Sequence, residues 1–226
     1  KQKTAYEIRP RDWSSDVCSS DLMTLTSSDA TAQKLAVASS GPVTVTWNDH
    51  INKNQLVWVS DAPLESIHGT SEGVTGSITL DPSNLSTLRG TVTTQTKTME
   101  TGNATRNNHL WSSEWMDVKK YPTISFKIIS VENIKVTGST ATGYATGDFT
   151  MHGVTKRITI PFGLSYMTES EKTRQRAPGD LVSINASFSI ALKDFNVAGQ
   201  EGTVGSKVGE TIKITAQLFG NVTGKG

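Results

Sequence analysis

The sequence has little of what identifies several common classes of protein. It contains one cysteine, Cys18, in 226 residues, so no disulfide within the chain can staple the fold. Its 22 Lys and Arg nearly balance its 21 Asp and Glu, which excludes the strongly basic character typical of nucleic-acid binding. No stretch approaches the ~18 consecutive apolar residues of a membrane-spanning helix. We therefore expect no nucleic-acid partner and no integral membrane span.

Motifs that would indicate a catalytic or metal site are also absent. The sequence contains no G-x-S-x-G nucleophile elbow and no H-E-x-x-H helix. A metal site needs three or four clustered ligands, whereas the histidines are widely separated, at His50, His68, His109 and His152. We predict a protein that is not an enzyme and has no catalytic residue, metal or cofactor. His152 precedes Gly153, and we expect its imidazole to tie down a hairpin turn.

The opening segment differs from the rest of the chain. Residues 1–22 read KQKTAYEIRPRDWSSDVCSSDL, show no sustained period and are followed by Met23. They resemble translated sequencing-adapter read-through, and we expect them to be non-native; a natural disordered tail is the alternative. Without them the chain has no cysteine, which is compatible with an oxidising compartment. We expect a periplasmic or extracellular protein whose signal peptide was lost with the true N-terminus.

Alternating apolar and polar residues dominate the sequence from residue 43 onward. Ile158, Ile160 and Phe162, for example, alternate with Thr159 and Pro161, which is the pattern of a strand with one dry face. Gly, Asn and Pro lie between such runs, where turns are required. The pattern predicts about ten strand segments: residues 43–47, 55–60, 64–68, 74–80, 91–99, 123–131, 143–151, 158–166, 183–192 and 212–218. So many strands with so little helix predict an all-β, antiparallel barrel or sandwich.

Residues 103–120 break the alternation. Leu110, Trp111, Trp115 and Met116 lie near helical spacing, and Pro122 follows as a stop. We predict one short helix here that caps one end of the barrel.

The domain boundaries follow from composition. Residues 23–42 are rich in Ser, Thr and Ala and end in Gly41-Pro42, a turn signal. We interpret them as a leader or linker, residues 43–222 as one barrel domain, and residues 223–226 as a tail.

Four stretches of the domain resemble the YceI family. They are TGNATRNNHL at residues 101–110, DVKKYPTISF at 117–126, GDFTMHGVTK at 147–156 and VGETIKI at 208–214. They occur in the order that the family shows, and several joint matches are far more specific than one motif. The resemblance implies a lipocalin-like barrel of eight antiparallel strands whose interior holds an isoprenoid or fatty chain.

The start of the domain departs from the family pattern. Most members carry a D-x-x-H-S-x-[IV]-x-F stretch, whereas this chain reads NQLVWVS at residues 54–60 and APLESI at 62–67. Because the first strands line the barrel, the departure concerns the identity of the ligand more than the fold.

The resemblance turns residues of the barrel interior and one barrel end into candidate ligand contacts. Arg106 and His109 would meet a polar head group. Trp111, Trp115 and Tyr121 would form an aromatic lid, although packing of the helix on the barrel end predicts the same three residues. Alternation alone favours a barrel interior filled by side chains. Only the family resemblance favours an interior that holds a ligand. The expected ligand-binding residues are Arg106, His109, Leu110, Trp111, Trp115, Phe126, Phe149, Ile160, Phe162, Phe188 and Ile190.

The leading hypothesis is non-catalytic binding, sequestration or transport of a long apolar lipid, such as a polyisoprenoid, an isoprenoid quinone or a fatty chain. Each buried CH₂ group contributes about 0.8 kcal/mol, so such a ligand needs few polar contacts. One alternative is an interaction module with a filled barrel, and another is an isomerase or hydrolase that uses Arg106, His109 and Asp117. An apolar tunnel would favour the first hypothesis, a plugged barrel the second and a small polar pocket the third. Formation of a homodimer stays open.

Overall fold

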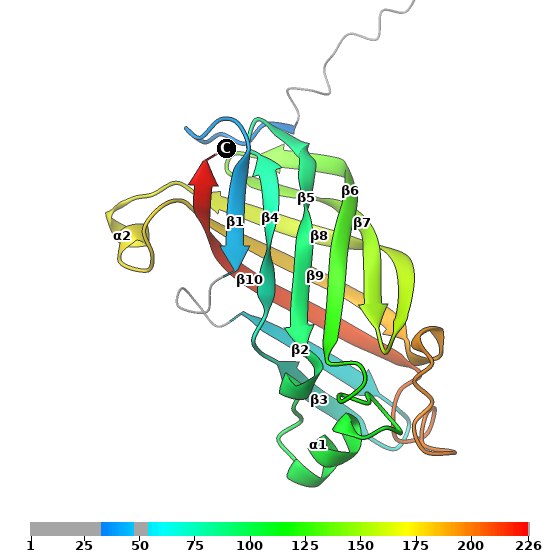
Figure 1. Cartoon of the computed structure of the whole chain (residues 1–226). Helices are drawn as coiled ribbons and strands as arrows, with labels where there is room; N and C mark the ends of the chain where they lie inside the picture. The colour runs from blue at the N-terminus through cyan, green and yellow to red at the C-terminus, as the bar shows by residue number, and fades with distance from the viewer. Residues whose placement is uncertain (1–32, 48–53, 226) are drawn as a thin grey trace, which may run out of the picture.

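The computed structural model describes residues 33–47 and 54–225. The segment 1–22, which we expect to be non-native, lies outside the described residues. Strands make up most of the described chain (Figure 1). In order, they are β1 (Val43–Trp47), β2 (Gln55–Asp61), β3 (Ser66–Ser71), β4 (Thr75–Asp81), β5 (Asn84–Gln95), β6 (Thr123–Thr137), β7 (Thr140–Met151), β8 (Val154–Met167), β9 (Leu181–Ala191) and β10 (Thr211–Lys225).

The strands form a closed antiparallel barrel, as the sequence predicted. The sheet runs β1-β4-β5-β6-β7-β8-β9-β10, and β10 pairs again with β1. Two strands pair with successive parts of the same edge of β10. Val43 of β1 pairs with Lys225, and Gln55 of β2 pairs with Gln217. In the same way β3 pairs with β2 while β4 pairs with β1. Ten strand segments therefore fill the eight positions of the barrel wall.

Strict alternation explains why these strands have one buried face. In β8, Ile160, Phe162 and Leu164 are buried, while Pro161 between the first two is exposed. The outer face carries cross-strand threonine pairs, with Thr146 and Thr159 hydroxyls 2.8 Å apart. The apolar side chains thus face one another inside the barrel, where they form the main hydrophobic core.

The helices are short and lie at the ends of the barrel. Helix α1 (Ala104–Trp111) lies within the segment predicted to be helical, and α2 (Glu171–Arg174) lies in a charged loop at the opposite end (Figure 1). The sequence predicted one short helix, so α2 is an addition to it. Helix α1 is shorter than expected because the Ser112 N–H bonds back to the His109 carbonyl oxygen at 3.0 Å, and turns follow to residue 120.

Several strand boundaries differ from the predicted ones; β6, for example, continues to Thr137 rather than ending at residue 131. Strand β5 begins at Asn84 rather than at residue 91, and a 3₁₀ turn, η2 (Thr96–Thr98), ends it before residue 99. Strand β10 continues to Lys225, beyond both the strand end expected at residue 218 and the domain end expected at residue 222, because β1 pairs with its last residues. In the extensions of β5 and β10, Gly, Ser, Thr and Asn interrupt the apolar alternation, so pairing with a neighbour and not the pattern sets the length.

The segment before β1 packs on one end of the barrel, which we call the Leu35 end. Leu35 is fully buried, and its N–H donates to the Pro82 carbonyl at 2.8 Å. The next N–H, from Ala36, donates to the carbonyl of Gly138 at 2.8 Å. These bonds reach the β4–β5 and β6–β7 turns, so the described part of the expected leader, residues 33–42, lies across this end.

A hydrogen-bonded cluster adds to the Leu35 end. Asp180 Oδ2 accepts from the hydroxyls of Ser39 and Tyr166, at 2.6 Å and 2.7 Å. Asp180 Oδ1 accepts from the Glu169 N–H at 2.8 Å. Burial of the phenol, together with its bond to Asp180, raises the pKa of Tyr166 to about 12. The cluster therefore joins the segment before β1 to the end of β8.

The opposite end, which we call the α1 end, is built from connections that are distant in sequence. The Leu64 N–H in the β2–β3 turn donates to the Ser206 carbonyl oxygen of the β9–β10 connection at 3.1 Å. Gln200 of the same connection donates to Glu114, which follows α1, at 3.0 Å. No helix of the described residues is long and apolar enough to cross a membrane.

Candidate functional site

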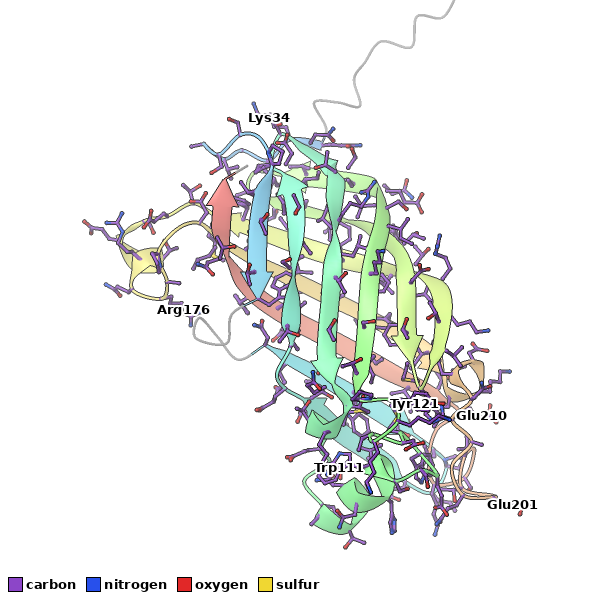
Figure 2. The ribbon with its side chains drawn as sticks, viewed as in Figure 1. Lys34, Trp111, Tyr121, Arg176, Glu201 and Glu210 are labelled. Atoms are coloured by element: carbon purple, nitrogen blue, oxygen red, sulfur yellow. The ribbon has the colours of Figure 1, made fainter. Side chains whose placement is uncertain are left out.

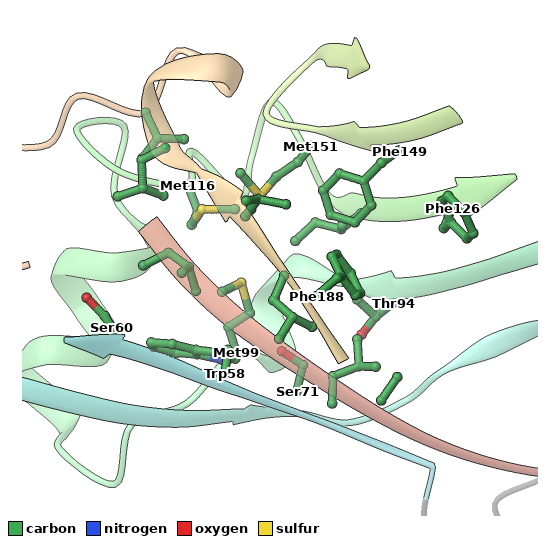
Figure 3. Close-up of a pocket in the computed structure, with 18 of the residues that line it drawn as sticks. Trp58, Ser60, Ser71, Thr94, Met99, Met116, Phe126, Phe149, Met151 and Phe188 are labelled. Carbon is green, nitrogen blue, oxygen red and sulfur yellow. The ribbon is translucent and has the colours of Figure 1, made fainter. Parts of the chain in front are cut away.

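The barrel encloses a cavity of about 410 Å³, within the range of roughly 300–1,000 Å³ that is typical of small-molecule sites. Its walls come from all eight positions of the barrel, and it extends toward the α1 end. Figure 3 shows its central part, where Phe149, Met151 and Phe188 project into it. The barrel is therefore not filled by its own side chains.

The apolar side chains expected to line the barrel do line this cavity. Phe149 packs edge-to-face on Phe188, with ring centroids 5.9 Å apart, and on Phe195, at 5.4 Å. Strand alternation places Phe188 inside and Ser187 outside, where the Ser187 hydroxyl lies 3.5 Å from that of Thr215. The six predicted wall residues on the cavity are Phe126, Phe149, Ile160, Phe162, Phe188 and Ile190.

Polar side chains gather where the cavity meets the α1 end. Arg106 of α1 forms an ion pair with Glu65 of the β2–β3 turn at 2.5 Å, and the two side chains are 35% and 38% exposed. Both residues line the cavity, as do His109 and Lys207. The partial exposure means that water screens this pair. The α1 end thus combines an apolar interior with a charged rim.

The local sequence explains why α1 presents these side chains. Asn103 caps the helix, since its side chain accepts from the Arg106 N–H at 3.0 Å. Asn107 is buried, and its side-chain oxygen accepts from both the N–H and the hydroxyl of Thr101 at 2.8 Å. Arg106, His109 and Leu110 then fall on one face of the helix, at i, i+3 and i+4. The TGNATRNNHL stretch therefore fixes the helix start and aims that face at the cavity.

The three aromatic residues expected to form a lid are not together over the cavity, since Tyr121 and Trp111 do not line it. Trp115 lines the cavity and packs on the β9–β10 connection, where a Cβ on Gly199 would come within 2.4 Å of its ring. The indole N–H of Trp111 donates to the Met99 carbonyl at 2.9 Å, and the Lys97 ammonium lies 3.2 Å from its ring centroid. Figure 2 shows Trp111 at this end of the barrel.

His152 lies in the β7–β8 turn and has a positive φ of 50°. Its Nδ1 lies 3.1 Å from the Phe195 carbonyl oxygen, and its ring packs edge-on against Tyr121 at 4.6 Å between centroids. The imidazole thus joins the turn to the β9–β10 connection, which is the structural role expected for it.

The residues of the enzymatic alternative are not assembled into one site. Arg106 is paired with Glu65, while Asp117 lies beside Trp111 in a separate shallow depression on the outer side of α1. Among residues 33–47 and 54–225, no three His, Cys, Asp or Glu side chains are grouped to hold a metal ion.

Several cavity residues were not expected from the sequence. Trp58, Ser60 and Ser71 line the cavity from β2 and β3. The run QLVWVSD places apolar residues on both faces of β2, so the alternation is hidden there. The sequence offered one signal for these residues: Leu56, Trp58 and Ser60 are every second residue of the strand and therefore share one face. Met99, Met116 and Met151 also line the cavity, although the sequence patterns that include them did not single them out as cavity residues.

Comparison with known proteins is consistent with this geometry. The YceI-like domain family matches residues 29–219. A UPF0312 protein of Pseudomonas putida strain GB-1 is 33% identical over 145 residues, which cover 64% of this chain and 71% of that protein. Protein YceI of Salmonella newport is 32% identical over 142 residues, covering 63% of this chain and 69% of that protein.

Solved structures share the fold at lower identity. Burkholderia cenocepacia BcnA aligns with a TM-score of 0.60 at 18% identity, over 74% of this chain and 95% of that one. A polyisoprenoid binding domain from Saccharophagus degradans, implicated in plant cell wall breakdown, aligns with a TM-score of 0.59 at 12% identity, over 80% of this chain and 98% of that one. With the family match over most of its length, the chain belongs to the YceI-like family.

Proposed function

We propose that this protein binds one slender apolar lipid inside its barrel, as a carrier or reservoir and without catalysing a reaction. The observation that carries the proposal is the cavity of about 410 Å³ lined mainly by Phe, Ile, Leu and Met. The name of the Saccharophagus degradans domain, a structural neighbour, supports a polyisoprenoid as the ligand class. An isoprenoid quinone or a fatty chain has the same slender apolar form.

The cavity also favours this function over the two alternatives. An interaction module would have a barrel that side chains fill, and an isomerase or hydrolase would need a small polar pocket with converging groups. We extend the proposal to a site of action in the periplasm or outside the cell, which the absence of cysteine beyond Cys18 supports.

A fluorescent-lipid displacement series tests the proposal. Competing fatty acids of increasing chain length should bind more tightly with each CH₂, by up to about 0.8 kcal/mol, until the cavity is full. Affinity should change little between low and high salt, because salt screens charges but leaves apolar burial intact. Affinity that is independent of chain length would contradict the proposal.

A pair of neighbouring substitutions provides the matched control. Ala186→Phe adds volume inside the cavity and should weaken binding of the longest lipids most. Ser187→Phe adds the same ring on the outer face and should leave binding unchanged. Equal loss in both variants would mean that the lipid does not occupy the barrel.

Within this proposal, Arg106 and His109 tune the preference for a polar head group. Replacing both with Ala should shift the selectivity among lipids of equal length while an apolar chain stays bound. Native mass spectrometry of the purified protein identifies the class of any lipid that co-purifies, by its mass.

A further inference from the structure

Polar side chains interrupt the apolar lining on one side of the cavity, where Leu56 and Ile67 also lie. We call Trp58, Ser60, Ser71 and Thr94 the polar wall; they come from β2, β3 and β5, line the cavity and are at most 8% exposed. The facing strands β7, β8 and β9 contribute apolar side chains, among them Phe149 and Phe188 (Figure 3). A ligand that consisted only of hydrocarbon would offer no hydrogen-bond acceptor to this wall.

Within the polar wall, the indole of Trp58 lacks a partner. The Ser60 hydroxyl oxygen accepts from the Gly209 N–H at 2.9 Å, and the Thr94 hydroxyl donates to the Glu72 carbonyl at 3.1 Å. The Trp58 Nε1 atom is buried and has no hydrogen-bond partner in the protein. Buried indole N–H groups usually find an acceptor, so this donor requires an explanation.

The direction of this N–H is fixed by the neighbouring strand. Trp58 pairs with Gly69 of β3, and a Cβ on Gly69 would come within 2.1 Å of the indole Cζ2. The ring therefore lies flat on the backbone of β3, in a place that only glycine leaves free. In Figure 3 the Trp58 nitrogen is on the side of the ring toward Ser71, and Ser60 is on the other side. The donor is thus held in one orientation before any ligand arrives.

We propose that the lipid bound by this protein carries a carbonyl oxygen within its apolar body, and that the Trp58 N–H donates a hydrogen bond to it. The inference rests on the proposed function and names the chemical class of its ligand, a ketone or quinone lipid rather than a pure hydrocarbon. A carbonyl oxygen has two lone pairs and no hydrogen. It can accept from Trp58 without adding a donor that would itself need a partner.

A second indole borders the same cavity. Trp47 Nε1 is also buried without a hydrogen-bond partner, but Trp47 belongs to β1, and the polar wall is made by β2, β3 and β5. Trp58 has the polar neighbours that a carbonyl needs, since Ser71 lies two residue pairs away on the same face. The assignment is therefore to Trp58, and Trp47 serves as a comparison.

The test compares two competitors in the displacement assay. Laurone is a symmetrical long-chain dialkyl ketone, and tricosane is the alkane with the same number of carbons. Trp58→Phe keeps an aromatic ring but removes the N–H, and it should lower the preference for laurone over tricosane about fivefold, the value of one net hydrogen bond. Using the ratio in each variant cancels changes in general apolar packing.

Three further variants make the test decisive. Trp111→Phe removes an indole N–H that lies outside the cavity, and the ratio should stay as in the original chain. Ser71→Ala should lower the ratio less than Trp58→Phe, and it carries the test if a thermal melt shows that Trp58→Phe does not fold. Trp47→Phe should not lower the ratio; a fall there instead of at Trp58 overturns the assignment.

The outcomes separate this inference from the proposed function. If both competitors displace the probe and their ratio is the same in the original chain and in the folded variants, lipid binding stands and the Trp58 assignment is wrong. If neither competitor nor any fatty acid binds the folded protein, the proposed function itself fails.

Discussion

The two ends of the barrel are closed by different kinds of contact. At the Leu35 end, a fully buried leucine and the cluster around Asp180 lie over the barrel. At the α1 end, the contact between α1 and the β2–β3 turn is a half-exposed ion pair at the rim of the cavity. Buried apolar contacts and buried hydrogen bonds contribute several times more stability than a screened ion pair. We therefore expect the Leu35 end to contribute more stability than the ion pair at the α1 end, and under the proposed function a ligand would enter at the α1 end.

The largest expected effect lies in the wall that both ends share. Phe188→Asp places a carboxylate inside the cavity and removes a ring packed on Phe149, so it should lower the free energy of unfolding by about 3 to 5 kcal/mol. Ser187→Asp changes the outer face and should stay within about 0.5 kcal/mol. Urea denaturation of both variants measures the difference. Comparable losses would mean that the strand does not face the way described.

Two leucines test the comparison of the ends directly. Leu35→Ala leaves a cavity under a residue that is 0% exposed and should cost about 2 to 3 kcal/mol. Leu64→Ala, at the α1 end, alters a side chain that is 73% exposed and should be close to neutral. Thermal or urea unfolding checks both. If Leu35→Ala were as mild as Leu64→Ala, the segment before β1 would not hold the Leu35 end.

The pH dependence of stability sharpens the comparison at the Leu35 end. The pKa of Tyr166 is about 12 in the folded protein and 10.0 without the fold, so the unfolded chain loses this proton first as the pH rises. The contribution of Tyr166 is therefore complete below pH 10 and falls by about 2 to 3 kcal/mol by pH 12. Urea unfolding between these pH values measures it. Tyr166→Phe should remove this part of the slope, and an unchanged slope would count against the assignment.

The smallest expected effect is at the α1 end. A double-mutant cycle with Arg106→Gln and Glu65→Gln should give a coupling of roughly 0.2 to 1 kcal/mol, because both side chains are more than a third exposed. The coupling should decrease in high salt. A coupling of several kcal/mol that is insensitive to salt would contradict the description of this ion pair as weak and screened by water.

The sequence predicted the wall of the barrel far better than its ends. Period-2 alternation in residues such as Phe162 and Phe188 reports burial on one face directly, and the structure confirms the closed antiparallel barrel. The role of Leu35 escaped prediction because Leu35 and Val37 form too short an apolar run to show a period. The burial of Leu35 depends on turns at Pro82 and Gly138 that only the folded chain brings near.

The candidate site shows the same division. The apolar lining residues could be chosen from alternation together with the family resemblance, and ten of the eleven expected ligand contacts line the cavity. Trp111 and Trp58 were harder to place. Trp111 points away from the cavity because its N–H bonds to Met99, a contact between α1 and the chain before it. Trp58 went unnoticed because Val57 and Val59 on either side are also apolar.

The pairing of β1 with the end of β10 has a consequence for how the protein is made. The barrel closes only when Val43 meets Lys225, so the first described strand must wait for the last one to be synthesised. Such distant contacts are slow to form, because the entropy of closing the loop is lost before the contact is gained. During translation the sheet from β4 to β9 can assemble while its two edges stay unpaired. The cavity is therefore complete only when β10 has paired with both β9 and β1, and under the proposed function a lipid can be enclosed only after that step.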